Sequence, residues 1–457
     1  MIIGFTRTAF AEFLVLSGLY AVMVLSEGIH CSAAVYWTNA VIVVYSLASL
    51  LRRSDRSYSA RKFFFLFVLF FMGIAPLMQF KMGVEAVGGY TIEEGTYVRV
   101  NAMIIGVIVI FEAVYFYSYH HIRRPLMRPS EGVVAVGESR RRRWRLTLLG
   151  ISVACVAATV IYFIDEPIRL LVRTLESDNH GYDGQLRTGG TYLKLLMEWI
   201  VRPLPAVCCL VYWIMGRSRG WKVVFLVLML VTCFPTAIER LRTATYYIAL
   251  LIVAFPGLRY GNRFVNVFLV GILVVFPWLN NFRRWGTEGA EWYHVDFSML
   301  WDINFDSYQS LAFVVQNHFI DFAGQAQEFL LFWIPRFFWP EKPQMSGYRM
   351  AKEFDLSYDF IAMNFWGEGY IMAGYAGVAL FTAVAAWILA KVDKTYWHFY
   401  DGMPRSLFAG LFLLLISLEF YCLRGDLVGG LITTLSLLAL YYGVGRLTYG
   451  FLGSNRT

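Results

Sequence analysis

The sequence predicts an all-α polytopic membrane protein, and two observations support this prediction. Of its 457 residues, 58% are hydrophobic and only 16% are charged, whereas a soluble domain carries about a quarter charged residues. Several apolar runs also exceed the roughly 18 residues that favour a membrane-spanning helix. Residues 63–80 form the plainest run, because no charged residue interrupts it.

Hydropathy divides the chain into about twelve spans of one membrane domain, residues 1–457, without a visible internal repeat. The expected spans are 9–28, 33–51, 63–80, 100–119, 146–164, 195–215, 222–238, 244–258, 264–280, 366–390, 406–423 and 427–445. Residues 281–365 form a large loop that is too long for a structureless connection, so we expect it to be functional. Within this loop, residues 329–339 are aromatic and too short to span, which predicts an interfacial helix ending at Trp339-Pro340.

The formal charge of +8 is concentrated in short loops that the twelve-span count places on one face. An excess of Lys and Arg in such loops marks the cytoplasmic face. We therefore attribute the charge to topology rather than to nucleic-acid binding. Both termini are expected in the cytoplasm, and the 281–365 loop is expected outside it.

Arginines nevertheless stand at span ends on the opposite face, where positive charge should be scarce. They are Arg240, Arg242, Arg283, Arg284, Arg336 and Arg424. A charge at this depth is costly without a partner, and guanidinium binds phosphate through paired hydrogen bonds. As a set they predict a diphosphate site. The alternative for each one is a lipid phosphate or a local carboxylate, such as Glu239 for Arg240 or Asp426 for Arg424.

The segments around these arginines resemble the Wzy-type oligosaccharide repeat-unit polymerases of bacteria, the O-antigen and exopolysaccharide polymerases. The similarity covers about residues 235–430. It rests on Glu239-Arg240-Leu241-Arg242, on residues 281–286, 334–343, 364–370 and 374–377, and on Leu423-Arg424-Gly425-Asp426.

The resemblance implies a glycosyltransferase of the bacterial inner membrane with its active face outside the cytoplasm. It would transfer a growing glycan from polyprenyl diphosphate onto a polyprenyl-diphosphate-linked repeat unit. Lipid-linked oligosaccharides, membrane lipid, a chain-length regulator and a flippase would be its partners. The catalytic residues implied are Glu368, Arg240, Arg283 and Arg336, and the substrate-binding residues are Arg242, Arg284, Lys342, His318, Arg424 and Asp426.

The resemblance also implies that the arginines stabilise charge on the leaving diphosphate, as a metal does in other transferases. The outer face shows no Asp-x-Asp motif and no clustered carboxylate site for a metal, so we expect no metal and no cofactor. Glu368, flanked by glycines that admit close approach, is the first candidate for a general base. The other candidates are His318, Asp321, Glu328 and Asp302.

Three alternatives remain open at this point. A glycan ligase uses the same donor with another acceptor, and only the resemblance favours a polymerase over it. A transporter or flippase places ionisable groups near mid-membrane, whereas these spans look nearly charge-free, with Glu112 and Glu198 toward span ends. A purely structural role would leave the outer arginines unexplained.

Overall fold

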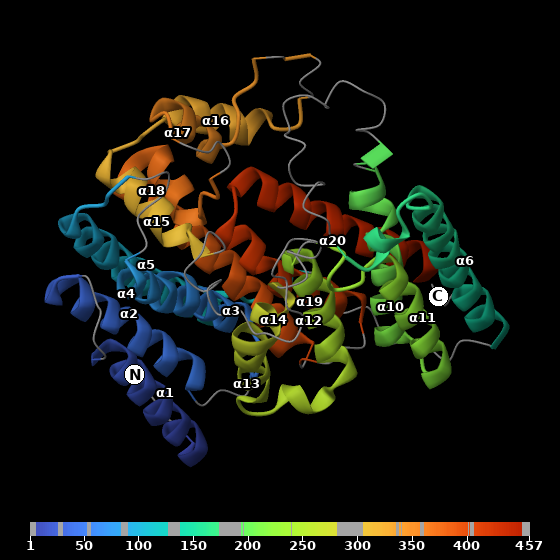
Figure 1. The fold of residues 1–457 in the computed structure, drawn as a ribbon. Helices are drawn as coiled ribbons and strands as arrows, with labels where there is room; N and C mark the ends of the chain where they lie inside the picture. The colour runs from blue at the N-terminus through green and yellow to red at the C-terminus, as the bar shows by residue number, and fades with distance from the viewer. Residues whose placement is uncertain are drawn as a thin grey trace.

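The computed structural model is helical in all the regular elements that it describes (Figure 1). The described residues are 6–25, 31–52, 56–83, 90–126, 138–172, 193–194, 196–238, 240–280, 305–334, 338–339, 341–356, 361–400, 402 and 406–449. The helices of the first part are α1 (Arg7–Leu25), α2 (Ala33–Leu51), α3 (Ala60–Phe67), α4 (Ala75–Met82), α5 (Glu94–His121), α6 (Glu138–Tyr162), α10 (Pro203–Met215), α11 (Arg219–Thr232), α12 (Arg240–Ala254), α13 (Arg263–Val270) and α14 (Phe276–Asn280). Those that follow are α15 (Ser307–Gln316), α16 (Phe322–Leu331), α17 (Ser346–Glu353), α18 (Phe365–Lys394), α19 (Leu407–Arg424) and α20 (Leu427–Tyr449).

Eight of the described helical segments are long and apolar enough to cross a membrane, which makes this a multi-pass membrane protein. They are Ala33–Leu51, Ala60–Met82, Glu94–His121, Glu138–Tyr162, Met197–Met215, Phe365–Phe399, Leu407–Arg424 and Leu427–Thr448. Two shorter apolar helices, Arg242–Ala254 and Arg263–Leu279, coincide with expected spans. Helices α1 and α11 overlap the remaining two, and the count of twelve spans stays a prediction.

The segment Ala60–Met82, which contains α3 and α4, forms the centre of the bundle. Between Phe63 and Met78 it is apolar all round, so this stretch has no face suited to water and is enclosed by other helices. Phe64 stacks on Phe111 of α5 with 3.6 Å between ring centroids, and Phe67 packs edge-on against Phe420 of α19. Helices α2 and α18 complete the shell around this segment.

Helix α15 is buried, although its residues were expected in the external loop. Every residue from Ser307 to Val315 is at most 3% exposed. Its polar side chains have partners on the neighbouring helices: Tyr308 Oη donates to Asn101 Oδ1 (2.8 Å), and Gln309 Nε2 donates to Gln79 Oε1 (2.9 Å). Buried polar groups are tolerated when they are hydrogen-bonded. The loop therefore re-enters the bundle against α4, α5 and α18.

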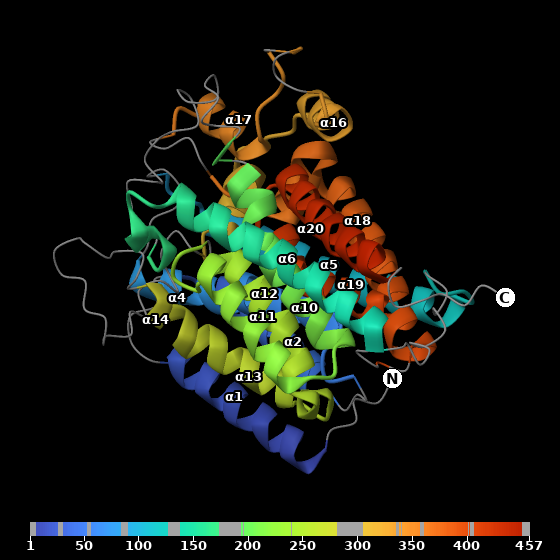
Figure 2. The same ribbon diagram turned by 90° about the vertical axis from the view of Figure 1, so that its right-hand side faces the viewer.

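Helices α16 and α17 lie over one end of the bundle, near the start of α18 (Figures 1 and 2). The interfacial helix was expected over 329–339, but α16 begins at Phe322 and ends at Leu331. The Asp321 carboxylate caps its start by accepting from the Gly324 amide (2.9 Å). Lys342 Nζ donates to the carbonyls of Phe332 and Ile334, which satisfies backbone groups just beyond its end.

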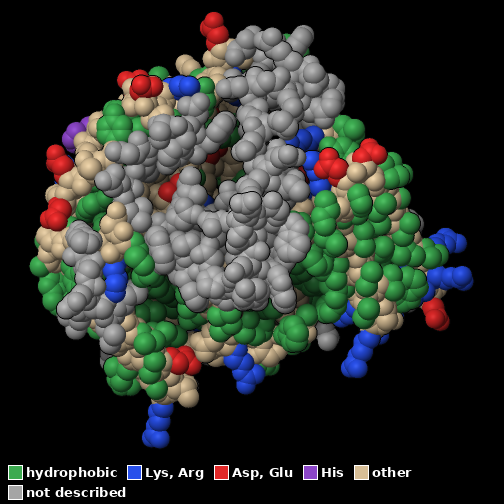
Figure 3. Space-filling view, in the orientation of Figure 1, with side chains coloured by type: hydrophobic (Ala, Val, Ile, Leu, Met, Phe, Trp, Pro, Cys, Tyr) green, Lys and Arg blue, Asp and Glu red, His purple; other side chains and the backbone are tan. Residues whose placement is uncertain are grey.

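The outer face of α16 is apolar, as an interfacial helix requires. Phe322, Leu330 and the following Trp333 are 60%, 65% and 68% exposed. Many Lys and Arg side chains project instead from the lower and right-hand edges of the molecule, away from α16 and α17 (Figure 3). This is the asymmetry from which the sequence predicts a cytoplasmic face.

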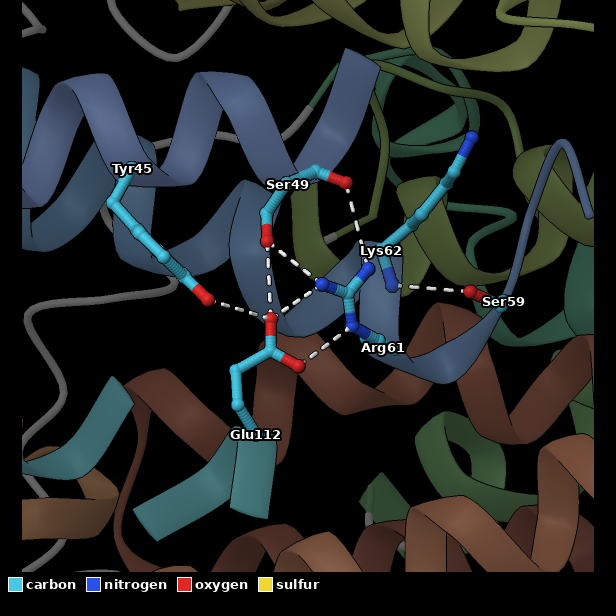
Figure 4. Close-up of polar contacts among 6 residues, drawn as sticks. All are labelled: Tyr45, Ser49, Ser59, Arg61, Lys62 and Glu112. Carbon is cyan, nitrogen blue, oxygen red and sulfur yellow. Dashed lines mark hydrogen bonds and ion pairs between the residues drawn. The ribbon is translucent and has the colours of Figure 1, made fainter. Parts of the chain in front are cut away.

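A buried ion pair joins α3 to α5 beside α2 (Figure 4). Arg61 Nε donates to Glu112 Oε2 (3.1 Å), and the side chains are 11% and 12% exposed. Arg61 Nη2 also donates to Ser49 Oγ (2.7 Å), and Tyr45 Oη donates to Glu112 Oε1 (3.2 Å). The pair is fully bonded, so Glu112 has a structural role in this conformation.

Neutralising one member of this pair should destabilise the protein more than removing both. Glu112→Gln leaves the Arg61 guanidinium without a counter-charge, which costs about 3–5 kcal/mol. The double variant Arg61→Met/Glu112→Leu replaces the pair by apolar groups and should recover most of that loss. Thermal unfolding of the purified variants in detergent measures both effects. Equal midpoints for the single and double variants would contradict this account of the pair.

Candidate functional site

The start of α18 places a buried carboxylate at the end of the bundle that carries α16 and α17. Asn364 caps the helix: its side-chain oxygen accepts from the amides of Trp366 (3.0 Å) and Gly367 (2.8 Å). Glu368 lies in the first turn of the helix so fixed, and its side chain is 0% exposed. A fully buried carboxylate is costly unless it is hydrogen-bonded.

The glycines near Glu368 allow two parts of the α18 backbone to pack closely against each other. Helix α18 breaks at Ala373 and Gly374, where Gly374 has a φ of 60° that other residues rarely adopt. Beyond the break, Gly377 packs on Gly369 so closely that a Cβ on Gly377 would overlap the Gly369 carbonyl. The expected close approach at these glycines is therefore made within α18.

One side chain from α16 and one from α17 donate hydrogen bonds to Glu368. Ser346 Oγ, at the start of α17, donates to Glu368 Oε1 (2.6 Å), and Gln325 Nε2, from α16, donates to Glu368 Oε2. The short helices α16 and α17 are thus both hydrogen-bonded to α18 through Glu368.

Arg349 of α17 contacts Gln325, the donor to Glu368, and also two further carboxylates. Its guanidinium donates to Asp321 Oδ2 (2.6 Å) and to Gln325 Oε1 (2.6 Å), and it lies 3.5 Å from Glu328 Oε2. One cation therefore serves three side chains along a single face of α16. The spacing of 321, 325 and 328 places them on that face.

Asp426 joins this group from the opposite side, at the start of α20. Its Oδ2 accepts from the Gly429 amide (2.7 Å). Burial raises the pKa of Glu328 to about 8, and the nearby Asp426 carboxylate contributes to the rise. Burial also raises the pKa of Asp426 itself. Glu328, Glu368 and Asp426 thus form a buried carboxylate cluster that no sequence motif indicates.

The cluster does not have the arrangement of a metal site. Across the described part of the chain, no three His, Cys, Asp or Glu side chains converge as ligands for an ion. The cluster is instead arranged around hydrogen-bond donors, namely Ser346, Gln325 and Arg349.

Arg242 was predicted to bind substrate, but its guanidinium contacts a carboxylate of the chain. Nη1 lies 3.1 Å from Glu198 Oε2, and the guanidinium also lies over the Trp199 ring, 4.1 Å from its centroid. Arg202 shares the same carboxylate at 3.6 Å. The local-carboxylate alternative therefore accounts for Arg242, with Glu198 as the partner.

The other predicted residues lie in different places. Arg424 is partly buried, 5.9 Å from the Phe71 ring centroid, and Lys342 donates to the carbonyls beyond α16. His318 is exposed and adopts a φ of 50°, with Nδ1 3.4 Å from Tyr370 Oη. The remaining predicted residues fall outside what the structure describes: Arg283, Arg284, Arg336, Asp302 and the side chain of Arg240.

A cleft of about 920 Å³ opens beside this cluster. It is lined by the chain after α15, by residues 341–344, and by one face of α17. His318, Asp321 and Arg349 contribute to its walls, so the cleft and the carboxylate cluster share Arg349 as a common boundary. Glu368 is not among the residues of the wall.

Comparison with known proteins adds no further identification. The chain matches no protein-family model, no curated protein and no solved structure.

Three residues of the site were not singled out from the sequence: Gln325, Ser346 and Arg349. All three lie on short helices in a stretch that hydropathy treats as loop. The available signal was spacing. Gln325 and Glu328 are three residues apart on α16, and Ser346 and Arg349 are three residues apart on α17, so each pair shares one helix face.

Glu328 should make the folded protein less stable as the pH rises. Its pKa is about 8 when folded and near 4.5 when unfolded, so between these values the folded chain holds a proton that the unfolded chain has lost. Stability from this group is complete below about pH 4.5 and is lost toward pH 8. Asp426, Glu368, Arg349 and Lys342 face the same group. The loss should therefore shrink, without vanishing, in Glu328→Gln, as thermal unfolding in nanodiscs from pH 5 to 8 would measure. An unchanged pH slope would contradict this.

A side chain at Gly377 should damage the outer end of α18. Gly377→Val forces the Gly369 backbone away and displaces the turn that carries Glu368, because the overlap is with backbone rather than with a flexible side chain. We expect a loss of at least about 2 kcal/mol. Gly106→Ala in α5 is the matched control, because its Cβ would meet open space. Expression and thermal unfolding compare the two variants, and equal stability would show that the close packing is not needed.

Proposed function

We propose that this chain is a membrane glycosyltransferase that polymerises lipid-linked oligosaccharide repeat units. The observation that carries the proposal is the cleft at the end of the bundle bearing α16 and α17, with His318, Asp321 and Arg349 in its walls. A polar cleft at one end of a multi-span bundle suits chemistry on a lipid-linked substrate, because the lipid stays in the membrane while its head group reaches the cleft. The proposed location is the bacterial inner membrane, with this end outside the cytoplasm and both termini inside.

The proposed reaction forms one glycosidic bond and breaks one phosphoester bond. A hydroxyl oxygen of the acceptor repeat unit attacks the anomeric carbon of the growing glycan. The bond from that carbon to polyprenyl diphosphate breaks, and the diphosphate leaves with the bonding electrons. The proton of the hydroxyl passes to a general base. Arginines at the membrane boundary stabilise the charge on the leaving group.

The candidate general bases differ in how far they are buried and in which hydrogen bonds they already make. Glu368 is 0% exposed and bonded to Ser346 and Gln325, so in this conformation it holds these side chains in place. Asp321 lines the cleft, but one oxygen caps α16 and the other accepts from Arg349. His318 lines the cleft and is exposed, and its Nδ1 lies 3.4 Å from Tyr370 Oη. We therefore assign His318 as the proton acceptor and Glu368 as a positioning residue.

A ligase remains the nearest alternative among enzymes. It would use the same donor, arginines and base but a different acceptor. The features that support a polymerase rather than a ligase are the sequence segments at 334–343 and 364–377, which resemble those of repeat-unit polymerases.

A transporter of lipid-linked oligosaccharide is the second candidate, and two buried residues favour it. Glu419 lies within α19 at 6% exposure, and neither carboxylate oxygen has a hydrogen-bond partner in the described part of the chain. Lys62, at 2% exposure, has no partner there for its ammonium group, which points away from the Arg61–Glu112 pair (Figure 4). Ionisable groups inside a bundle line transport paths. Glu419 lies within the expected span 406–423, so that span is not free of charge.

Removing the proposed catalytic groups should leave single repeat units in place of polymer. The test complements a deletion strain with the wild type, Arg283→Ala, Arg336→Ala or His318→Gln and compares surface glycan profiles. Loss of an arginine that stabilises leaving-group charge costs about 10²–10³-fold in rate. Arg169→Ala is the matched control, because that arginine is paired with Glu166 at the surface. Membrane abundance of each variant is measured in parallel.

The other outcomes identify the alternatives. Full-length polymer in the arginine variants would exclude the diphosphate site. Polymer that forms but never reaches its final acceptor would indicate a ligase. Repeat units that never reach the outer face would indicate a transporter, and Glu419→Gln would then become the decisive variant.

A further inference from the structure

Among the described residues that line the cleft, the positive and negative charges are equal in number. Its cations are Lys342, Arg349 and Lys352, and its carboxylates are Asp321, Glu341 and Glu353, three of each. Arg349 is paired with Asp321 at 2.6 Å. The Lys342 ammonium group donates to backbone carbonyls, and the Lys352 ammonium group lies over the Tyr348 ring, 5.4 Å from its centroid.

This balance favours an uncharged ligand. A diphosphate site presents several guanidinium or ammonium groups whose hydrogen bonds are directed at the phosphate. Here the best donor of the set, Arg349, has its guanidinium bonded to Asp321 and Gln325 and close to Glu328. A phosphate entering the cleft would have to break these contacts and would also meet Glu341 and Glu353.

The remaining wall combines rings with amides. Tyr348, Phe319 and Phe354 present aromatic surface, and Asn317 and Gln344 provide amides that can both donate and accept. Phe354 is held by edge-on contacts with Phe319 and Phe313, with ring centroids 5.8 Å and 5.2 Å away. These contacts fix the Phe319 and Phe354 rings in the wall. A sugar ring has an apolar C–H face and a rim of hydroxyls, which suit aromatic surface and amides respectively.

The turn that ends α15 places His318 in the wall of the cleft. His318 follows α15 with a φ of 50°, a left-handed conformation that a residue other than glycine adopts at a cost. The conformation keeps His318 exposed in the cleft wall while the next residue, Phe319, packs against Phe354. A left-handed residue at this position commonly ends a helix, and here the Phe319 amide donates to the Val314 carbonyl in the last turn of α15 (3.1 Å).

We propose that this cleft binds sugar rings of the acceptor repeat unit, and that the diphosphates are bound elsewhere. The choice of the acceptor rests on the function proposed above, because an acceptor hydroxyl must lie beside His318. Tyr348 stacks on a sugar ring, Asn317 and Gln344 bond its hydroxyls, and the paired charges keep phosphate out.

The test uses an oligosaccharide that lacks phosphate. Mild acid releases it from the lipid-linked repeat units of the deletion strain, and a fluorophore marks its reducing end. Polarisation then measures its binding to the full-length protein in nanodiscs. We expect saturable binding that Tyr348→Ala or Gln344→Ala weakens by about tenfold, equivalent to one lost stacking or hydrogen-bonding contact of ordinary strength. Tyr348→Phe keeps the ring and should retain binding, as should Tyr260→Ala, which removes a 66% exposed tyrosine outside the cleft.

Two results would overturn the inference: equal binding by the wild type and both alanine variants, or displacement of the probe by inorganic pyrophosphate. The glycan profiles separate this failure from failure of the proposed function. If Arg283→Ala and Arg336→Ala abolish polymer while the cleft variants bind normally, only the cleft assignment is wrong. If the cleft variants lose binding while every arginine variant and His318→Gln makes full polymer, the cleft is a glycan site and the proposed function fails.

Discussion

The hydrogen bonds to buried Glu368 determine how the outer end of this protein is built. Helices of ten and eight residues, as α16 and α17 are, are marginal on their own. Each donates one side chain to the same carboxylate. If either helix moved away, a fully buried carboxylate would lose a donor and bear the desolvation cost alone. The two helices are thus fixed to α18 by the cost of leaving that carboxylate unsatisfied.

The same arrangement links the buried cluster to the cleft. Gln325 donates to Glu368 and accepts from Arg349, and Arg349 donates in turn to Asp321 in the cleft wall. The orientation of the wall therefore depends on a carboxylate that no ligand can reach. It also depends on protons, because one guanidinium cannot balance all the carboxylates near it. Burial raises the pKa of Glu328 to about 8, the nearby Asp426 carboxylate adds to the rise, and Arg349 opposes it only in part.

Hydropathy predicted the membrane helices well because the thickness of the bilayer sets both their length and their composition. It failed at α15, which is buried but carries Ser307, Tyr308, Gln309 and Ser310. Such residues look exposed in a hydropathy profile unless their partners Gln79 and Asn101 are known, and these lie more than 200 residues away. Glu368 was noticed because glycines flank it. Arg349 was missed because its role depends on contacts between α16 and α17, which no local pattern encodes.

The predicted arginines and the cleft differ in charge, and we propose that they bind different parts of the substrates. Arg242 is bound to Glu198 and Arg349 to Asp321, so a guanidinium in this protein is not by itself evidence of a phosphate. The case for a diphosphate therefore rests on the predicted arginines whose side chains lie outside the described residues, namely Arg240, Arg283, Arg284 and Arg336. The cleft has balanced charge and an aromatic wall. A transferase acting on two lipid-linked sugars needs both kinds of site, because the leaving group is an anion and the nucleophile is a neutral hydroxyl. Keeping them apart prevents the acceptor's own diphosphate from occupying the place of its sugar.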